Sequence, residues 1–367
     1  SCDAFRTRYV TPAARFARKP ANSRHESCTS VKSSEAGDVM DLNAMYLGID
    51  IGGTSTKVGV VDASGDLIGK TRFSLPELQT EAQCRQYIAQ IIDFVHGTGV
   101  YASELAGVGL AAPGIVVNGI PQLTPNVKAD WPTLLNVIRS EFEGTPFECI
   151  NDANAAALGE MWRGAASGAQ SAMLVTIGAG IGAGIVADGR VVQGHGGAGE
   201  IGHMTIVPEG RQCQCGRRGC VEQYASSRGI VANFREAEAN GIAGTSKHVP
   251  QNDTDALSVF EAYREGDPRA AYAVGIFTDK LGYALAQATC VVDADVILLG
   301  GGVAGAADLF LPALQGTYRK NCLSTCADTQ IRVATLGNIA GMVGVVRYVQ
   351  MMSESLDPFD NLFGMGL

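Results

Sequence analysis

The sequence predicts an α/β protein built from two related α/β domains that face a common central cleft. Two units of the form strand–glycine turn–strand carry this prediction, one beginning at Tyr46 and the other at Met173. The composition agrees, because 46 glycines, 46% apolar residues and only 7% aromatic residues are typical of a soluble α/β protein. A chain of 367 residues suits one large domain or two medium-sized domains.

The first unit opens the predicted small N-terminal domain, residues 46–155. A strand at Tyr46–Asp50 runs into a turn at Gly52–Thr54, and a second strand follows directly. The backbone of this turn can approach phosphate oxygens, with Ser55 and Lys57 beside it to supply a hydroxyl group and charge. A Walker loop would instead end in GK[ST] and lead into a helix, and neither is present. An ordinary hairpin turn is the alternative to a phosphate site.

The rest of this domain places polar side chains where elements end. Its further predicted elements are a helix that begins with a Thr80–Gln83 capping box, a strand at Gly107–Ala112 that leads to Gly114, a turn at Thr124–Asn126, and a strand at Phe147–Ile150. An alanine-rich helix then opens at Asn151-Asp152. Asp152 therefore lies where a strand meets a helix, either as a simple N-cap or as a functional carboxylate.

The second unit belongs to the predicted large domain, residues 156–338. A strand at Met173–Ile177 is followed by a glycine turn at Gly178–Gly184 and a strand at Ile185–Ala187. The glycine spacing imitates a dinucleotide fingerprint, but that site requires a helix directly after the glycines, and here a second strand follows. Further on, a buried strand leads through Gly300–Gly302 into a helix predicted from Val303, and the start of this helix could bind a nucleotide.

A cysteine cluster in the large domain predicts a zinc site. The segment 213–220 reads CQCGRRGC, and a GEIGH motif ten residues upstream offers His203 as a fourth ligand. Three cysteines and one histidine are a standard structural zinc set. Such a metal would fix Glu200, His203 and Glu222 relative to one another, as a receptor for sugar hydroxyls. A disulfide or free surface cysteines are the alternatives.

The net charge, the cysteines and the N-terminal segment limit which classes of protein and which compartments fit this sequence. A net charge of −9 argues against nucleic-acid binding, and no apolar run reaches the roughly 18 residues that span a membrane. The remaining cysteines show no disulfide framework, which favours a reducing compartment such as the cytoplasm. Residues 1–45 are basic and contain several serines, and we expect a disordered tail. This segment is either a transit peptide for a plastid or the mitochondrial matrix, or an unstructured extension before a start at Met45.

Together these motifs resemble the ROK family of bacterial-type sugar kinases. The resemblance rests on the Asp50–Thr54 turn, Asn151-Asp152, the second glycine turn, GEIGH at 199–203 and CxCGxxGCxE at 213–222, and it covers nearly the whole chain from Tyr46. The continuation at 222–226 is most similar to the ROK glucokinases. The resemblance implies an actin/hexokinase-like (ribonuclease H-like) fold whose two domains close over ATP and a sugar. It also implies that the C-terminal helix, about 339–352, joins the small domain, and that the protein is a homodimer or homotetramer.

The resemblance further implies roles for particular residues. Asp152 would be the catalytic base, and the sugar would be held by Gly114, Asn126, Asn151, Glu200, His203 and Glu222. The residues expected around ATP and Mg²⁺ are Asp50, Gly52, Gly53, Thr54, Ser55, Lys57, Thr176, Gly178, Gly180, Gly182, Gly301 and Gly302. Structural Zn²⁺ would be bound by His203, Cys213, Cys215 and Cys220.

Other functions within the same family are the alternatives to a glucose kinase. Members also include transcriptional repressors, but these need a helix-turn-helix before the first strand, and residues 1–45 lack an apolar period and contain Pro12 and Pro20. A non-catalytic sugar-sensing protein would not need Asp152 and both glycine turns. Within the kinases, another hexose or hexosamine, such as fructose or N-acetylmannosamine, is the alternative substrate.

Overall fold

The computed structural model describes residues 43–122, 124 and 127–354. Nearly all of the expected N-terminal tail lies outside these residues, and so does Asn126, one of the expected sugar ligands. The described residues all belong to one compact unit.

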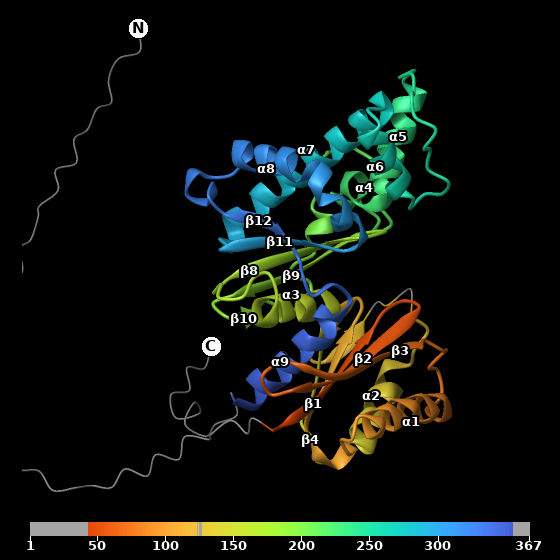
Figure 1. Cartoon of the computed structure of the whole chain (residues 1–367), viewed down its shortest axis with the longest axis vertical. Helices are drawn as coiled ribbons and strands as arrows, with labels where there is room; N and C mark the ends of the chain where they lie inside the picture. The colour runs from red at the N-terminus through yellow and green to blue at the C-terminus, as the bar shows by residue number, and fades with distance from the viewer. Residues whose placement is uncertain (1–42, 123, 125–126, 355–367) are drawn as a thin grey trace, which may run out of the picture. The chain divides into compact units, whose positions relative to one another are not determined.

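The first sheet has the strand order β3-β2-β1-β4-β7 (Figure 1). Its strands are β1 (Met45–Ile51), β2 (Ser55–Asp62), β3 (Leu67–Ser74), β4 (Leu105–Ala112) and β7 (Phe147–Asn151). One face is covered by α1 (Glu81–Gly97) and α2 (Trp131–Glu141), whose apolar residues form a single core with the strands. The predicted capping box of Thr80 and Gln83 is present at the start of α1. A small hairpin, β5 (Ile115–Val117) and β6 (Ile120–Gln122), follows β4.

The second sheet has the order β10-β9-β8-β11-β12. Its strands are β8 (Ala172–Ile177), β9 (Ile181–Ala187), β10 (Arg190–Val191), β11 (Val296–Gly300) and β12 (Gln330–Val333). The helices packed in its main core are α4 (Glu222–Ala225), α5 (Ser227–Ala239), α6 (Ala256–Arg264), α7 (Pro268–Val292) and α8 (Ala307–Asn321). Asp267 caps the start of α7, and Pro268 is its first residue.

The two sheets repeat one arrangement. In each sheet an antiparallel three-stranded meander (β1–β3 and β8–β10) is followed by two strands parallel to its first strand (β4, β7 and β11, β12). The prediction of two related α/β halves is therefore confirmed, and the fold is of the actin/hexokinase-like class.

The halves are joined by a close helix pair, α3 (Asp152–Arg163) and α9 (Ala340–Glu354), which lies between the sheets (Figure 1). Glycine is needed at this crossing, because a methyl group on Gly344 would collide with the Ala155 carbonyl and one on Gly159 with the Ala340 carbonyl. The helix α9 also packs on the first sheet. The boundary expected at 155/156 falls inside α3, a single continuous helix.

Two local predictions about glycines were wrong. The turn expected over Gly178–Gly184 is shorter, because β9 already begins at Ile181. Gly184 lies in the strand, where its missing side chain lets the backbone of Ala153 approach closely. The helix expected from Val303 begins instead as a 3₁₀ turn, Gly302–Ala306, and becomes α-helical only at Ala307. Glycine has low helix propensity, which disfavours an α-helical start at Gly302.

In the described part of the chain, no helix is both long and apolar enough to cross a membrane.

Candidate active site

Asp152 lies at the junction of β7 and α3, but it is not the helix cap. Asn151 takes that position, since its side-chain oxygen accepts hydrogen bonds from the backbone N–H groups of Ala153 (2.9 Å) and Asn154 (3.0 Å). The amide nitrogen of Asn151 donates to the Gly114 carbonyl (2.9 Å) and to Asp152 (3.1 Å). Asn151 therefore orients Asp152 and leaves the second oxygen of its carboxylate available.

The electrostatic surroundings of Asp152 raise its pKa. Part of the residue faces open space, yet protein atoms enclose the carboxyl group on most sides. This burial, together with the negative charge of Asp50, raises the pKa of Asp152 to about 6, although Lys57 and a backbone hydrogen bond oppose the shift. A carboxylate with such a pKa is ionised at neutral pH and can still accept a proton during a reaction.

One cavity beside Asp152, here called the β1–α9 cavity, has a volume of about 490 Å³. Its lining includes seven residues expected around ATP and Mg²⁺ or as the base: Asp50, Gly52, Lys57, Asp152, Thr176, Gly301 and Gly302. Lys57 Nζ donates to Asp50 Oδ2 at 2.9 Å. Gly341 of α9 lies against this carboxylate, so that a Cβ there would be only 3.1 Å from Asp50 Oδ2. The start of α9 thus adds backbone dipoles that favour an anion in the cavity.

Not all expected phosphate ligands line this cavity. Gly53 and Thr54 are exposed at the tip of the β1–β2 hairpin, and Ser55 is buried within β2. Gly180 and Gly182 line a different cavity, on the other side of Asp152. Gly178 lines a third one, beside α6.

The cavity on the other side of Asp152, here called the zinc-loop cavity, has a volume of about 440 Å³. It brings together the described residues that were expected to hold a sugar: Gly114, Asn151, Asp152, Glu200, His203 and Glu222. These polar groups come from segments far apart in the sequence, yet they surround one space. Donors and acceptors gathered in this way suit a ligand with several hydroxyl groups.

The third cavity, here called the α6 cavity, is larger and more apolar, with a volume of about 660 Å³. Its lining includes Leu257 and Phe260 of α6, Val303 and the backbone of Gly178. Because it shares Gly302 with the β1–α9 cavity, the two spaces adjoin. A flat apolar group attached to phosphates could occupy both.

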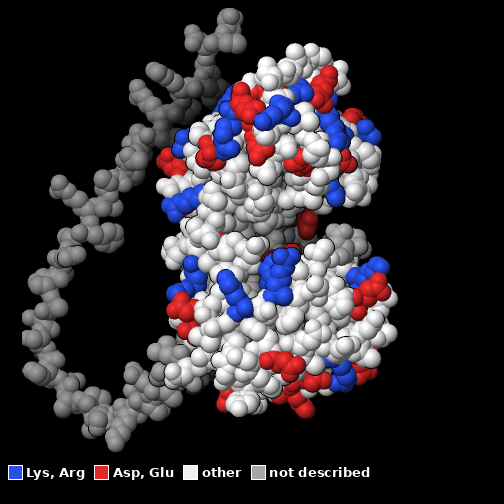
Figure 2. Space-filling view, turned by 45° about the vertical axis from the view of Figure 1, so that its right-hand side comes forward, with Lys and Arg blue, Asp and Glu red and all other residues white. Residues whose placement is uncertain are grey.

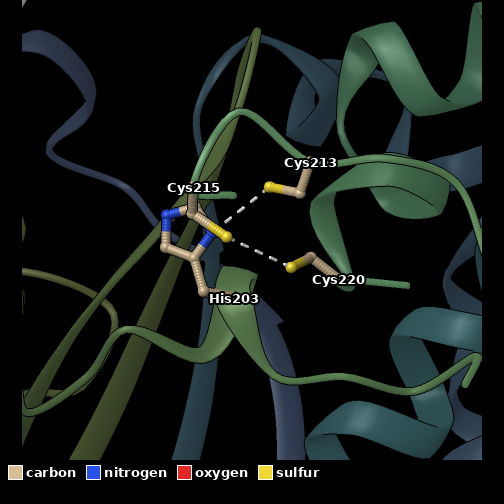
Figure 3. Close-up of side chains that lie close together, drawn as sticks. All are labelled: His203, Cys213, Cys215 and Cys220. Atoms are coloured by element: carbon tan, nitrogen blue, oxygen red, sulfur yellow. Dashed lines mark hydrogen bonds between the residues drawn. The ribbon is translucent and has the colours of Figure 1, made fainter. Parts of the chain in front are cut away.

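The four expected zinc ligands form one cluster (Figure 3). One ligand atom from each of His203, Cys213, Cys215 and Cys220 lies within 4.8 Å of the others. Cys213 Sγ is 3.7 Å from His203 Nδ1, and Cys215 Sγ is 3.6 Å from Cys220 Sγ. A tetrahedron with metal–sulfur bonds of about 2.3 Å has edges of about 3.8 Å, so the residues fit zinc. In this structure all three cysteines are free thiols, and none of them forms a disulfide.

The cluster is connected to the zinc-loop cavity through His203 and Glu222. The Nδ1 atom of His203 faces Cys213, whereas its Nε2 atom is 3.9 Å from Glu200 Oε2. The Cys213 thiol donates to Glu222 Oε1 at 3.1 Å. A backbone hydrogen bond from Arg217 lowers the pKa of Cys215 to about 6, which favours the thiolate that zinc requires. One nitrogen of His203 is thus directed to the metal cluster and the other to the cavity.

A residue that the sequence reading missed, Arg211, closes the base of the cysteine loop. Its guanidinium donates to the Gln223 carbonyl (2.7 Å), to Asn233 Oδ1 (2.7 Å) and to Glu236 Oε2 (2.6 Å). It also lies over the ring of Tyr224, 4.6 Å from the centroid. These contacts tie the segment before Cys213 to the segment after Glu222.

Glu160 of α3 was missed as well. It is fully buried, lines the β1–α9 cavity and accepts hydrogen bonds from the backbone N–H groups of Ala165 (2.8 Å), Thr335 (3.1 Å) and Leu336 (2.7 Å). It therefore fixes the turn that leads into α9. No local motif marks Glu160, because its partners lie far along the chain.

Comparison with known proteins agrees with this geometry. Residues 46–351 match the ROK family. A glucokinase of Halalkalibacterium halodurans is 34% identical over 322 residues, which covers 85% of this chain and 97% of that protein. The structure of a ROK family glucokinase from Streptomyces griseus, in complex with glucose and AMPPNP, superposes with a TM-score of 0.66 at 29% identity, covering 84% of this chain and all of that one. A ROK hexokinase from Thermus thermophilus gives a TM-score of 0.70 at 30% identity, covering 85% and 99%. This chain belongs to the ROK family.

Proposed function

We propose that this ATP-dependent sugar kinase transfers the γ-phosphoryl group of ATP to the 6-hydroxyl group of glucose, with Asp152 as general base. The observation that carries the proposal is the position of Asp152, which lines both the β1–α9 cavity and the zinc-loop cavity. A nucleophile bound in one cavity and a phosphoryl group bound in the other would meet at this carboxylate. In this proposal the substrates lie between residues 46–155 with α9 and residues 156–338.

The β1–α9 cavity would hold the phosphates of ATP. Backbone N–H groups at Gly301 and Gly302 and the start of α9 would donate to them, and Lys57 would add positive charge. Mg²⁺ prefers carboxylate and phosphate oxygens, so Asp50 would help to hold it, and the ion would neutralise charge on the transferred group. The adenosine would occupy the adjoining α6 cavity, where its base can contact Phe260 and Leu257.

The zinc-loop cavity would hold the sugar. Glu200 and Glu222 would accept hydrogen bonds from neighbouring hydroxyl groups, and His203 Nε2 would bind another. The Asp152 carboxylate would take the proton of the 6-hydroxyl group as that oxygen attacks phosphorus, a role typically worth about 10²–10⁴-fold in rate. A site built to pair hydroxyl groups rejects sugars that lack them or present them in a different orientation.

Zinc would act as an organiser rather than in the chemistry. Bound by His203, Cys213, Cys215 and Cys220, it would fix the ring orientation and tautomer of His203, and through Cys220 it would fix the backbone that leads to Glu222 two residues later. The reacting atoms would meet Asp152, not the metal.

A panel of hexoses tests the proposed substrate. With ATP and Mg²⁺ at fixed concentration, ADP release should show a higher kcat/KM for glucose than for fructose, mannose or N-acetylmannosamine. If kcat/KM is higher for one of these other sugars, that sugar and not glucose is the preferred substrate. The proposed site of phosphoryl transfer would be unaffected by this result.

A further inference from the structure

The β1–α9 cavity contains more carboxylates than the binding of ATP and Mg²⁺ explains. In the described part of the chain, Asp50, Asp152 and Glu160 line it, and Lys57 is the single cation among them. Figure 2 shows a hollow on one face of the molecule, with acidic side chains inside it and Lys and Arg side chains beside it. The phosphates of ATP are anions, so a carboxylate near them weakens binding unless it has another task. Asp50 would help to hold Mg²⁺ and Asp152 would act as base, which leaves Glu160 without one.

Glu160 is fully buried, and hydrogen bonds occupy both oxygens of its carboxylate. Oε2 accepts from the backbone N–H groups of Ala165 (2.8 Å) and Thr335 (3.1 Å) and from the Thr335 hydroxyl group (3.3 Å). Oε1 accepts from the backbone N–H of Leu336 (2.7 Å). These donors are all neutral, so backbone dipoles and a hydroxyl group stabilise the carboxylate instead of an ion pair. A carboxylate enclosed in this way cannot itself reach the nucleotide, the sugar or Mg²⁺.

The end of α3 is shaped to hold this carboxylate. Gly164 directly follows the last residue of α3, and a Cβ there would collide with Glu160 Oε2. Ala165, the next residue, donates one of the hydrogen bonds. Thr335 and Leu336 approach from the other side, between the end of β12 and the start of α9. Glu160 therefore ties α3 to the segment that leads into α9.

This segment forms a wall of the β1–α9 cavity. Its residues in the lining are Ala334, Gly337, Asn338, Ala340 and Gly341. In the proposed function the first N–H groups of α9 donate to the phosphates, which requires that they point at the anion. The two consecutive N–H groups bound to Glu160 fix the backbone just before them. Because α3 also begins with Asp152, one helix sets the position of the phosphate wall relative to the base.

We propose, on the basis of the proposed kinase function, that Glu160 is a positioning residue for ATP. It holds the start of α9 against α3, so that the phosphates bind next to Asp152. Phosphoryl transfer depends mainly on the positioning of the phosphates and on charge stabilisation, so this contribution can exceed the repulsion that the carboxylate adds. The hydrogen bonds of Glu160 and its charge therefore act on ATP binding in opposite directions.

The variant Glu160→Gln separates these two effects by their sign. The amide removes the negative charge, but it also places an NH₂ group against N–H donors, so that some of them lose their acceptor. If positioning dominates, the KM for ATP and the Kd for the non-hydrolysable analogue AMPPNP should rise about tenfold or more, while the KM for glucose stays within about twofold. If the charge dominates, both nucleotide constants should fall. Steady-state kinetics and calorimetry on the whole chain give these values.

Two further variants separate positioning from charge and from general stability. Gly164→Ala displaces the carboxylate without removing its charge, so it should also weaken AMPPNP binding. Asp267→Asn is the matched control, because Asp267 is equally buried and accepts hydrogen bonds from the backbone N–H groups of Thr245 (2.9 Å) and Ser246 (2.8 Å). It lines none of the three cavities described above. It should lower the melting temperature and leave the nucleotide and glucose constants within about twofold.

Several results would overturn the proposal. Nucleotide constants that stay the same or fall in a folded Glu160→Gln protein would show that Glu160 does not position ATP. Equal weakening of ATP and glucose, or the same weakening in Asp267→Asn, would reduce Glu160 to a support of the fold. If Glu160→Gln does not fold, an unchanged AMPPNP affinity in Gly164→Ala has the same consequence. A wild-type chain that binds AMPPNP but phosphorylates no hexose would count against the proposed function, and AMPPNP binding would still decide the role of Glu160.

Discussion

Asp152 is subject to opposing influences that set its proton affinity. Burial and the charge of Asp50 favour the neutral acid, whereas Lys57 and the backbone N–H of Ala153 favour the carboxylate. An ordinary aspartate, with a pKa of about 3.9, would be ionised at neutral pH but would bind a proton weakly. The balance at Asp152, with a pKa of about 6, gives a carboxylate that is mostly ionised at neutral pH and basic enough to assist a hydroxyl group.

The pH dependence of turnover follows from this pKa. The base must be ionised, so kcat/KM for glucose should be constant near neutral pH and fall tenfold per pH unit below the raised pKa of about 6. Initial rates across the acidic range give the profile, and circular dichroism at each pH shows whether the chain stays folded. An acid limb that begins only near pH 4, the value of an ordinary carboxyl group, would mean that burial does not control this residue.

At the scale of elements, the cysteine loop is held in place at two independent points. The metal cluster would hold its tip, and Arg211 holds its base through Gln223, Asn233 and Glu236. Glu222 lies between them, next to Gln223 and in contact with Cys213. The metal cluster and the Arg211 contacts can therefore be removed separately by mutation.

Loss of the metal should weaken sugar binding more than nucleotide binding. Wild-type protein should contain about one zinc per chain, and Cys215→Ser should lose it and raise the KM for glucose, since His203 and Glu222 are no longer held together. The KM for ATP should change little. Cys322→Ser, which lies outside the cluster, is the control. Full activity of a zinc-free wild-type protein would defeat this role of the metal.

Removing the contacts that Arg211 makes at the foot of the cysteine loop should affect the sugar site through Glu222. Arg211→Ala should raise the KM for glucose by about tenfold, with a smaller change in kcat, because several charge-assisted hydrogen bonds and a ring contact are lost. Arg211→Lys should recover only part of the lost glucose affinity, since lysine cannot reproduce the planar, forked hydrogen-bonding geometry of the guanidinium group. Arg235→Ala, on the helix α5 that carries Asn233 and Glu236, removes only an exposed ion pair with Asp253 and should change neither constant. Equal behaviour of Arg211→Ala and Arg235→Ala would mean that Arg211 only supports the fold.

At the scale of the whole molecule, what the sequence could predict depended on how locally each feature is encoded. The Asn151-Asp152 junction, GEIGH and the cysteines are short motifs, and the structure gathers them as expected. Glu160 and Arg211 have partners far along the chain, so no pattern marks them. Gly184 was predicted to be part of a turn, but it lies in a strand. A glycine that allows another backbone to approach closely cannot be distinguished in the sequence from a glycine that allows the chain to turn.

The N-terminal segment should be dispensable for catalysis. The family match begins at residue 46, and each described candidate site residue lies at Asp50 or beyond. A protein that begins at Met45 should keep kcat/KM for glucose and for ATP within about twofold of the full chain. A tenfold weaker affinity for either substrate would show that the removed residues contribute to the site.

The central claim, that Asp152 is the base joining the two cavities, is tested most directly by Asp152→Asn. The amide keeps the size and shape of the side chain but cannot take up the proton. We predict that glucose affinity, measured by calorimetry, stays within about twofold while kcat falls by about 10²–10⁴-fold. A variant that binds glucose and turns over at a rate comparable to wild type would contradict the account and leave Asp152 as the first residue of a helix.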